Sequence, residues 1–133
     1  MTKSNVFLLD ANVLIALTTS DHSLHGRAMK WFRDGPLFAT CPVTQGALVR
    51  FQMRWGVNPS VQTAKAILQR IDLHARHEFW VDDASYLELP ENGVVGHRQI
   101  TDAYLVLLAR KHGGLLATMD EALAAIHKGV ALI

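Results

Sequence analysis

Three aspartates lie at separate points of the chain, each beside a segment rich in large apolar residues. Asp10 directly follows one apolar run, Asp102 lies near the start of an apolar helical pattern, and Asp120 follows a second short apolar run. Hard carboxylate oxygens with no converging Cys or His suit Mg²⁺ or Mn²⁺. An ion held in this way lowers the pKa of a bound water and stabilises charge on a phosphoryl oxygen. If the three residues meet in the fold, they predict hydrolysis of a phosphodiester bond.

Each aspartate by itself is also explained as a helix cap. Asp near a helix N-terminus accepts hydrogen bonds from free amide groups and complements the positive end of the helix dipole, an effect of about 0.3–1 kcal/mol. Three carboxylates in one cleft are harder to explain by capping, because like charges repel unless a cation lies between them. The metal hypothesis therefore depends on whether the fold brings the three together.

The segment before Asp10 indicates how the acids are positioned. Residues 6–9 are four large apolar residues in succession, typical of a strand buried on both faces of a parallel sheet. Further along, short apolar runs alternate with helical patterns. We expect strands at 6–9, 37–41, 77–81, 115–118 and 130–133. We expect helices at 11–17, 21–33, 42–55, 60–71, 100–110 and 120–126, with an irregular segment at 82–99.

This alternation predicts a three-layer α/β/α fold with a central, mostly parallel sheet, formed by a single domain of residues 1–133. In such a sheet the helices run back against the strands, so the carboxyl ends of strands and the N-termini of helices share one edge. We therefore expect Asp10, Asp102 and Asp120 at this edge. Gln45, in the first turn of the helix after the second strand, is expected to join them.

The composition limits the class of protein. Hydrophobic residues make up 50% of the chain and charged residues 19%, as in an ordinary globular domain, and the net charge of +1 excludes a strongly basic surface field. Cys41 is the only cysteine, so no internal disulfide can form, which fits a reducing cytoplasm. No apolar run approaches the roughly 20 residues needed to span a bilayer. We therefore expect a cytoplasmic protein that is not attached to a membrane.

Four short motifs together resemble a known family. They are 9–12 (Leu-Asp-Ala-Asn), 41–50, 100–105 (Ile-Thr-Asp-Ala-Tyr-Leu) and 118–120 (Thr-Met-Asp). The pattern resembles the PIN-domain ribonucleases and, more narrowly, the VapC toxins of bacterial type II toxin–antitoxin systems, over essentially the whole chain. The resemblance implies an endoribonuclease that depends on Mg²⁺ or Mn²⁺ and cuts RNA to leave a 5′-phosphate and a 3′-hydroxyl. It also implies a homodimer formed through the helices, held inactive by a cognate VapB-type antitoxin.

The resemblance assigns the acidic residues to a metal site. Asp10, Asp102 and Asp120 match the acidic ligands of the family, which makes them the candidate catalytic residues. Gln45 departs from the pattern, because the family usually has Glu in this region. An amide oxygen can still ligate a metal or its water, but the site loses one negative charge and its metal affinity should fall.

Polar and basic residues complete the candidate site. Asn12 and Thr118 match polar neighbours that orient the acidic ligands. Arg50 and Arg54 lie four residues apart on the helix that carries Gln45, and Arg98 precedes the third motif. Because contacts to the phosphate backbone dominate nucleic-acid affinity, these arginines are candidates for RNA binding, and each also fits a solvated helix face.

Other interpretations remain open. The main alternative is a PIN-like module that binds RNA or antitoxin without efficient turnover because Gln45 replaces an acid. A haloacid-dehalogenase-like phosphatase would need an acid where Asn12 stands, and a receiver domain would need a lysine that 118–120 does not offer. His22 and His25 are three residues apart, but with no third ligand evident they predict a surface pair rather than a zinc site.

Overall fold

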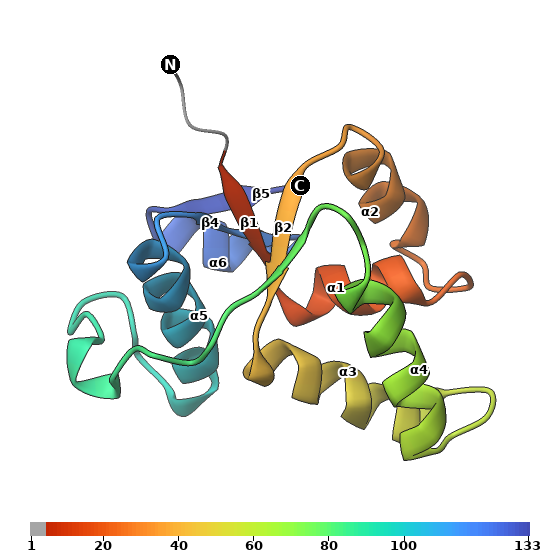
Figure 1. Cartoon of the computed structure of the whole chain (residues 1–133). Helices are drawn as coiled ribbons and strands as arrows, with labels where there is room; N and C mark the ends of the chain where they lie inside the picture. The colour runs from red at the N-terminus through yellow and green to blue at the C-terminus, as the bar shows by residue number, and fades with distance from the viewer. Residues whose placement is uncertain (1–4) are drawn as a thin grey trace.

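The central sheet is parallel throughout. The computed structural model describes residues 5–133, so the first four residues of the predicted domain lie outside the described part. The strands pair in the order β3-β2-β1-β4-β5, and every pairing is parallel (Figure 1). They are β1 (Val6–Leu9), β2 (Leu37–Thr40), β3 (His77–Phe79), β4 (Leu115–Thr118) and β5 (Val130–Leu132). The predicted α/β/α fold is confirmed.

Six α-helices occur among the described residues. They are α1 (Ala11–Thr18), α2 (His25–Phe32), α3 (Pro42–Trp55), α4 (Val61–Asp72), α5 (Ile100–Lys111) and α6 (Glu121–Ile126). Local signals explain several helix starts: Ser60 caps α4 by accepting a hydrogen bond from the N–H of Thr63 at 3.0 Å, and Pro42 occupies the first position of α3. Within residues 5–133, none of these helices combines the length and apolar character needed to cross a membrane.

The prediction for the start of the second helix is wrong. Helix α2 begins at His25 rather than directly after Asp21, and its N-cap, Leu24, makes no side-chain capping bond. The reason is a local turn, in which Nδ1 of His22 accepts a hydrogen bond from the N–H of Leu24 at 3.0 Å. Nδ1 of His25 lies 2.7 Å from the carbonyl oxygen of Ala16, so this histidine ties α2 to α1.

Several strand ends and the segment at 82–99 also differ from the prediction. Strands β2 and β5 each end one residue earlier than predicted. Strand β3 ends at Phe79 rather than at residue 81, although the N–H of Trp80 still donates to the carbonyl oxygen of Thr40 at 2.9 Å. The segment at 82–99, expected to be irregular, contains two single turns of 3₁₀ helix, η1 (Tyr86–Glu88) and η2 (His97–Gln99).

The core forms on both faces of the sheet. Leu8 and Leu9 of β1 are adjacent in sequence and both fully buried, because successive side chains of a strand point to opposite faces. Leu8 packs with residues of α5 and α6, whereas Leu9 packs with residues of α1, α2 and α3. Figure 1 shows the same division, with α5 and α6 on one side of the sheet and α1 to α4 on the other.

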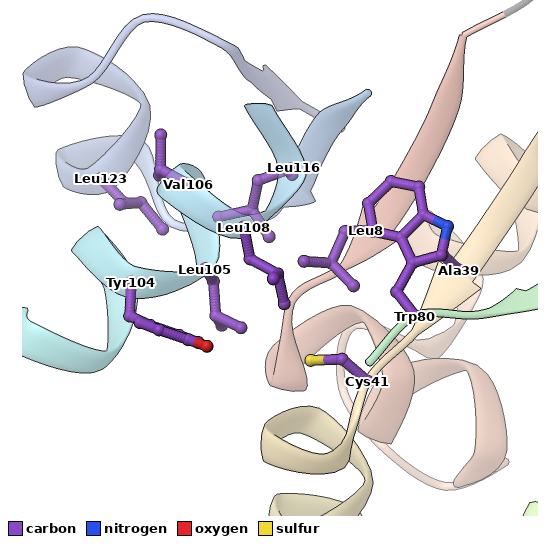
Figure 2. Packing of buried hydrophobic residues seen from close by; sticks show 11 residues of the cluster. Leu8, Ala39, Cys41, Trp80, Tyr104, Leu105, Val106, Leu108, Leu116 and Leu123 are labelled. Atoms are coloured by element: carbon purple, nitrogen blue, oxygen red, sulfur yellow. The ribbon is translucent and has the colours of Figure 1, made fainter. Parts of the chain in front are cut away.

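The packing of α5 matters for the site because Asp102 lies in its first turn. Figure 2 shows Leu105 and Leu108 of α5 pointing toward Leu8 of β1, with Trp80 on the far side of Leu8. Burying an apolar side chain of this size contributes about 1.5–3 kcal/mol, so several such residues hold the helix firmly. The first turn of α5 is thereby fixed near the carboxyl edge of the sheet.

Candidate active site at the carboxyl edge of the sheet

Asp10 lies at the end of β1 and is both a helix cap and a buried carboxylate. Its Oδ1 accepts a hydrogen bond from the N–H of Ala11 at 2.8 Å, and its Oδ2 accepts one from the hydroxyl of Thr118 at 2.7 Å. Burial is the main reason that the pKa of Asp10 is raised, the two hydrogen bonds lower it, and the negative charge of Asp120 raises it. Asp10 is therefore both the N-cap of α1 and a carboxylate that lies near another acid.

Thr118, the last residue of β4, connects the polar groups around Asp10. Its Oγ1 accepts hydrogen bonds from Nδ2 of Asn12 at 3.2 Å and from the N–H of Asp120 at 3.1 Å. Oδ1 of Asn12 in turn accepts from the N–H of Met119 at 3.4 Å. The hydroxyl donates its single proton to Asp10 and accepts two hydrogen bonds with its lone pairs, so it is held in one orientation. Asn12 and Thr118 are thus placed where they can orient the Asp10 carboxylate.

Asp102 and Asp120 reach the same edge from two helices. Burial raises the pKa of Asp102 from its ordinary value of 3.8 to about 6, and the negative charges of Asp10 and Asp120 add to this shift. Asp120 caps α6, where its Oδ1 accepts a hydrogen bond from the N–H of Leu123 at 3.1 Å. The fold therefore brings the three predicted aspartates close enough for their charges to interact.

The donor set suits a hard divalent cation that keeps part of its water shell. Within residues 5–133, no three Cys, His, Asp or Glu side chains lie close enough together to enclose a metal ion by themselves. Mg²⁺ is usually held by one or two carboxylates plus substrate phosphates and waters, rather than by a closed protein cage. The charge of Asp120 raises the pKa of Asp10, and the charges of Asp10 and Asp120 raise that of Asp102, so a dication among them would relieve the repulsion. The residues present therefore fit such an ion.

Gln45 makes its contact on the opposite side of β1. It lies in the first turn of α3, and its Nε2 donates a hydrogen bond to Oγ1 of Thr40, the last residue of β2, at 3.2 Å. Thr40 Oγ1 also lies 2.7 Å from Nε2 of His77 in β3. Strand β2 borders β1 on the side away from β4. Any contribution of Gln45 to a metal therefore depends on its remaining amide oxygen.

Thr40 and His77 are buried polar partners of Gln45 that the sequence analysis did not identify. A signal for Thr40 was present, because it ends a short buried strand just as Thr118 does. His77 could not be found in this way, since nothing local in the sequence shows that its ring reaches the neighbouring strand. Both side chains are buried.

The three arginines predicted to bind RNA lie in different places. The guanidinium of Arg50 lies against Gly46, one turn back toward the start of α3. Arg54 lies over the ring of Trp55 at the other end of this helix, 4.9 Å from the ring centroid. Arg98 is exposed in η2, directly before α5. Arg50 therefore extends toward the carboxyl edge of the sheet, whereas Arg54 lies at the far end of α3.

Comparisons with known proteins agree with this geometry. The model of the PIN domain family matches residues 7–129. Ribonuclease VapC29 of Mycobacterium tuberculosis (strain ATCC 25618 / H37Rv) is 50% identical over 127 residues, covering 95% of this chain and 94% of that protein. Ribonuclease VapC38 of the same strain is 37% identical over 118 residues, covering 85% of this chain and 84% of that protein.

Solved structures show the same fold at lower identity. VapBC2 from Rickettsia felis, bound to a DNA fragment from its promoter, matches with a TM-score of 0.65 and 13% identity, covering 96% of this chain and 97% of that chain. VapC20 from Mycobacterium tuberculosis, a Sarcin-Ricin loop cleaving toxin, matches with a TM-score of 0.64 and 17% identity, covering 94% and 98%. The match to the family model and the identity to the relatives show that the chain belongs to the PIN-domain family and, within it, to the VapC ribonucleases.

Proposed function

We propose that this chain is a toxin-type endoribonuclease that hydrolyses RNA phosphodiester bonds with Mg²⁺ or Mn²⁺ held by Asp10, Asp102 and Asp120. The observation that carries the proposal is the gathering of three carboxylates at one edge of the sheet, where their charges act on one another. The relatives named ribonucleases support it. A bound divalent ion would supply an activated water and stabilise charge on the phosphoryl oxygens.

Other residues of the chain would orient the acid and bind the RNA. Thr118 and the N–H of Ala11 hold the Asp10 carboxylate in one orientation, so that it is ready to bind a cation without first ordering itself. Arg50 would bind a phosphate of the RNA next to the cut bond, because its guanidinium reaches toward the start of α3. Gln45 would assist through its amide oxygen, directly or through a water.

We further propose that the protein acts in the cytoplasm as a homodimer and is neutralised by a VapB-type antitoxin. The VapBC2 structure supports the partner. Light scattering on the purified chain, alone and with its antitoxin, tests both the dimer and the complex.

The experiment that tests the activity is cleavage of a panel of structured RNAs by the purified, metal-stripped chain. Mg²⁺ or Mn²⁺ is added back, and the Asp102→Asn and Gln45→Glu variants are assayed beside the parent. We expect cleavage by the parent only with metal and none by Asp102→Asn. Metal-independent cleavage, or cleavage that survives in Asp102→Asn, would contradict the proposal.

The weakened-module alternative has a specific observation in its favour. Among the described residues the acids do not form a closed ligand set, and the amide of Gln45 is bonded to Thr40 rather than to them. If Gln45→Glu cuts RNA and the parent does not, the chain is a weakened relative of the nucleases. If neither cuts while antitoxin binding is intact, the protein is a binding module.

A further inference from the structure

Strand β3 forms one edge of the sheet and pairs only with β2. In Figure 1 the green segment after α4 crosses in front of the sheet, and no other element lies before it. The N–H of Trp80 donates to the carbonyl oxygen of Thr40 in β2 at 2.9 Å. Because alternate residues of a parallel strand bond to the same neighbour, Glu78 also faces β2 and Phe79 turns its main-chain groups away from the sheet.

The main-chain groups of Phe79 are free. Within residues 5–133, neither its N–H nor its carbonyl oxygen takes part in a hydrogen bond. The N–H of His77 is by contrast used, since it donates to the carbonyl oxygen of His74 at 3.0 Å. A strand edge with unpaired groups is a template for an extended segment of another chain. Phe79 is therefore the residue to which a further strand would bond.

A groove lies beside this edge. It has a volume of about 980 Å³ and is lined by one face of α4, by Gln45 and by Phe79. The α4 residues that line it run from Val61 to Asp72, which is about 16 Å of helix and the length of about five extended residues. Val61 and Phe79 are 55% and 48% exposed, so the groove offers apolar surface. A strand added to β3 would therefore place alternate side chains in this groove.

The opposite face of β3 carries a negative charge. Phe79 lines the groove beside α4, whereas Trp80 packs in the core with α5, so Glu78 lies on the same face as Trp80. Glu78 is exposed and forms no ion pair with another residue in the described part of the chain. Side chains that face each other on neighbouring strands attract when their charges are opposite. A lysine or arginine of the added strand is therefore favoured beside Glu78.

The polar side chains of the groove suit a peptide better than RNA. Gln45, Gln62 and Gln69 each present a carboxamide, which can donate to a carbonyl oxygen and accept from an N–H. The two charged residues that line the groove, Lys65 and Asp72, have opposite signs. The groove therefore has no excess of positive charge, which is the main source of affinity for a phosphate backbone.

We propose that the β3 edge and the groove beside α4 bind an extended segment of a partner protein in which apolar and basic residues alternate. The segment bonds through its main chain to Phe79 and becomes a sixth strand of the sheet. Its apolar side chains enter the groove, and a basic side chain lies beside Glu78. The proposal does not depend on nuclease activity, because it rests on hydrogen bonds, charge and shape at this edge alone.

Nuclear magnetic resonance of the isotope-labelled full chain tests the proposal directly. The probe is a capped nine-residue peptide of alternating valine and lysine. At saturation the N–H of Phe79 should exchange with solvent roughly 10-fold more slowly than without peptide, because it is then hydrogen-bonded. The same peptide with glutamate in place of lysine should bind roughly 5-fold more weakly, because its charge is like that of Glu78. Equal binding of the two peptides, or unchanged exchange at Phe79, would overturn the proposal.

Phe79→Pro and Leu132→Pro form a matched pair of variants. Leu132 is 47% exposed in the other edge strand, β5, and the N–H of Ile133 donates to the carbonyl oxygen of Thr118 at 2.9 Å, so Leu132 also turns its N–H outward. Edge strands tolerate proline where the N–H faces solvent. Phe79→Pro should weaken binding of the lysine peptide roughly 10-fold or more, and Leu132→Pro should leave it unchanged. The reverse result would place the peptide at β5 and contradict the proposal.

Glu78→Lys keeps the strand intact and decides the question even if Phe79→Pro does not fold. The variant should bind the glutamate peptide more tightly than the lysine peptide, the opposite of the order in the parent. An unchanged order would show that Glu78 does not face the segment. A short oligouridine, added to the complex with the parent, decides between peptide and RNA. If it displaces the peptide and shifts the resonance of Gln69, the groove is a nucleic-acid site and the peptide proposal is wrong.

Discussion

Two buried threonines, one in each strand beside β1, contact different kinds of partner: one a charged group, the other uncharged groups. Thr118 ends β4 and Thr40 ends β2, both strands pair with β1, and both side chains are fully buried. Thr118 donates to the carboxylate of Asp10, whereas Thr40 lies between the amide of Gln45 and the ring of His77. The register offsets them by one residue, because Leu8 pairs with Ala39 but Leu9 pairs with Ala117. Thr118 therefore supports a charged half around Asp10 on the face of the sheet covered by α5 and α6, and Thr40 supports an uncharged half around Gln45 on the opposite face.

The two halves differ in what burial does to them. In the charged half, burial and like charges raise the pKa values of Asp10 and Asp102, so the fold disfavours the ionised forms that would bind a cation. In the uncharged half, burial lowers the pKa of His77 and so favours the neutral ring that the hydrogen bonds need. The comparison shows that burial destabilises the ionised acids of the charged half, whereas it favours the neutral ring of His77 in the uncharged half.

The largest expected effect is the loss of cleavage when the charged half is neutralised. Asp10→Asn removes a carboxylate oriented by two hydrogen bonds, and we expect cleavage to fall by roughly 100-fold or more, at the top of the range for groups that support a metal. Asp34→Asn is the control, because Asp34 is exposed after α2. Metal-dependent RNA cleavage measures both. Unchanged cleavage in Asp10→Asn would remove the charged half from the mechanism.

Replacing each threonine with valine compares the two halves directly by stability. Thr118→Val leaves a carboxylate, an amide and a main-chain N–H without their partner, so we expect about 2–3 kcal/mol loss in the free energy of unfolding. Thr40→Val leaves only uncharged groups unpaired, and about 1–2 kcal/mol is expected. Denaturant unfolding measures both values. A larger loss for Thr40→Val would reverse the proposed order of the two halves.

The pH dependence of stability should show that ionised Asp102 destabilises the folded chain. Its pKa is about 6 in the folded chain against an ordinary 3.8, so between these pH values the native state binds more protons than the unfolded state. Stability from this group is therefore fully present below about pH 4 and is lost as the pH rises through about 6. Without metal, Asp102→Asn should be more stable than the parent at pH 7 and above. A parent that is equally stable or more stable there would contradict the assignment.

The smallest expected effect is the stabilisation of the metal-free chain by added Mn²⁺ or Mg²⁺. At an ion concentration a few times the Kd, binding to the native state alone adds about 1 kcal/mol to the free energy of unfolding. Asp102→Asn should respond less, because one of the repelling carboxylates is gone, whereas Thr40→Val should respond almost as the parent does. Thermal unfolding with and without the ion measures this, and equal responses of parent and Asp102→Asn would argue against an ion in the charged half.

Much of the fold could be predicted because the strongest elements carry their own signals. The strand at 6–9 and the helix at 100–110 were predicted almost to the residue, as β1 and α5. Both are runs of large apolar residues with clear ends, and burial on all sides gives such runs a strong signal. The start of α2 was wrong because His22 holds a turn through a ring nitrogen, a contact that no helix-capping pattern describes.

The sequence by itself determined that three aspartates end or begin buried segments, and the alternation of strands and helices placed them at one edge. Only the tertiary structure decided which side chains meet there. Thr118 reaches Asp10 across 108 positions of sequence, and Thr40 reaches His77 across 37. These contacts depend on the pairing of β1 with β4 and of β2 with β3, and on the register of each pair, and hydrophobic pattern specifies neither. The division of the site into a charged and an uncharged half therefore belongs to the folded sheet.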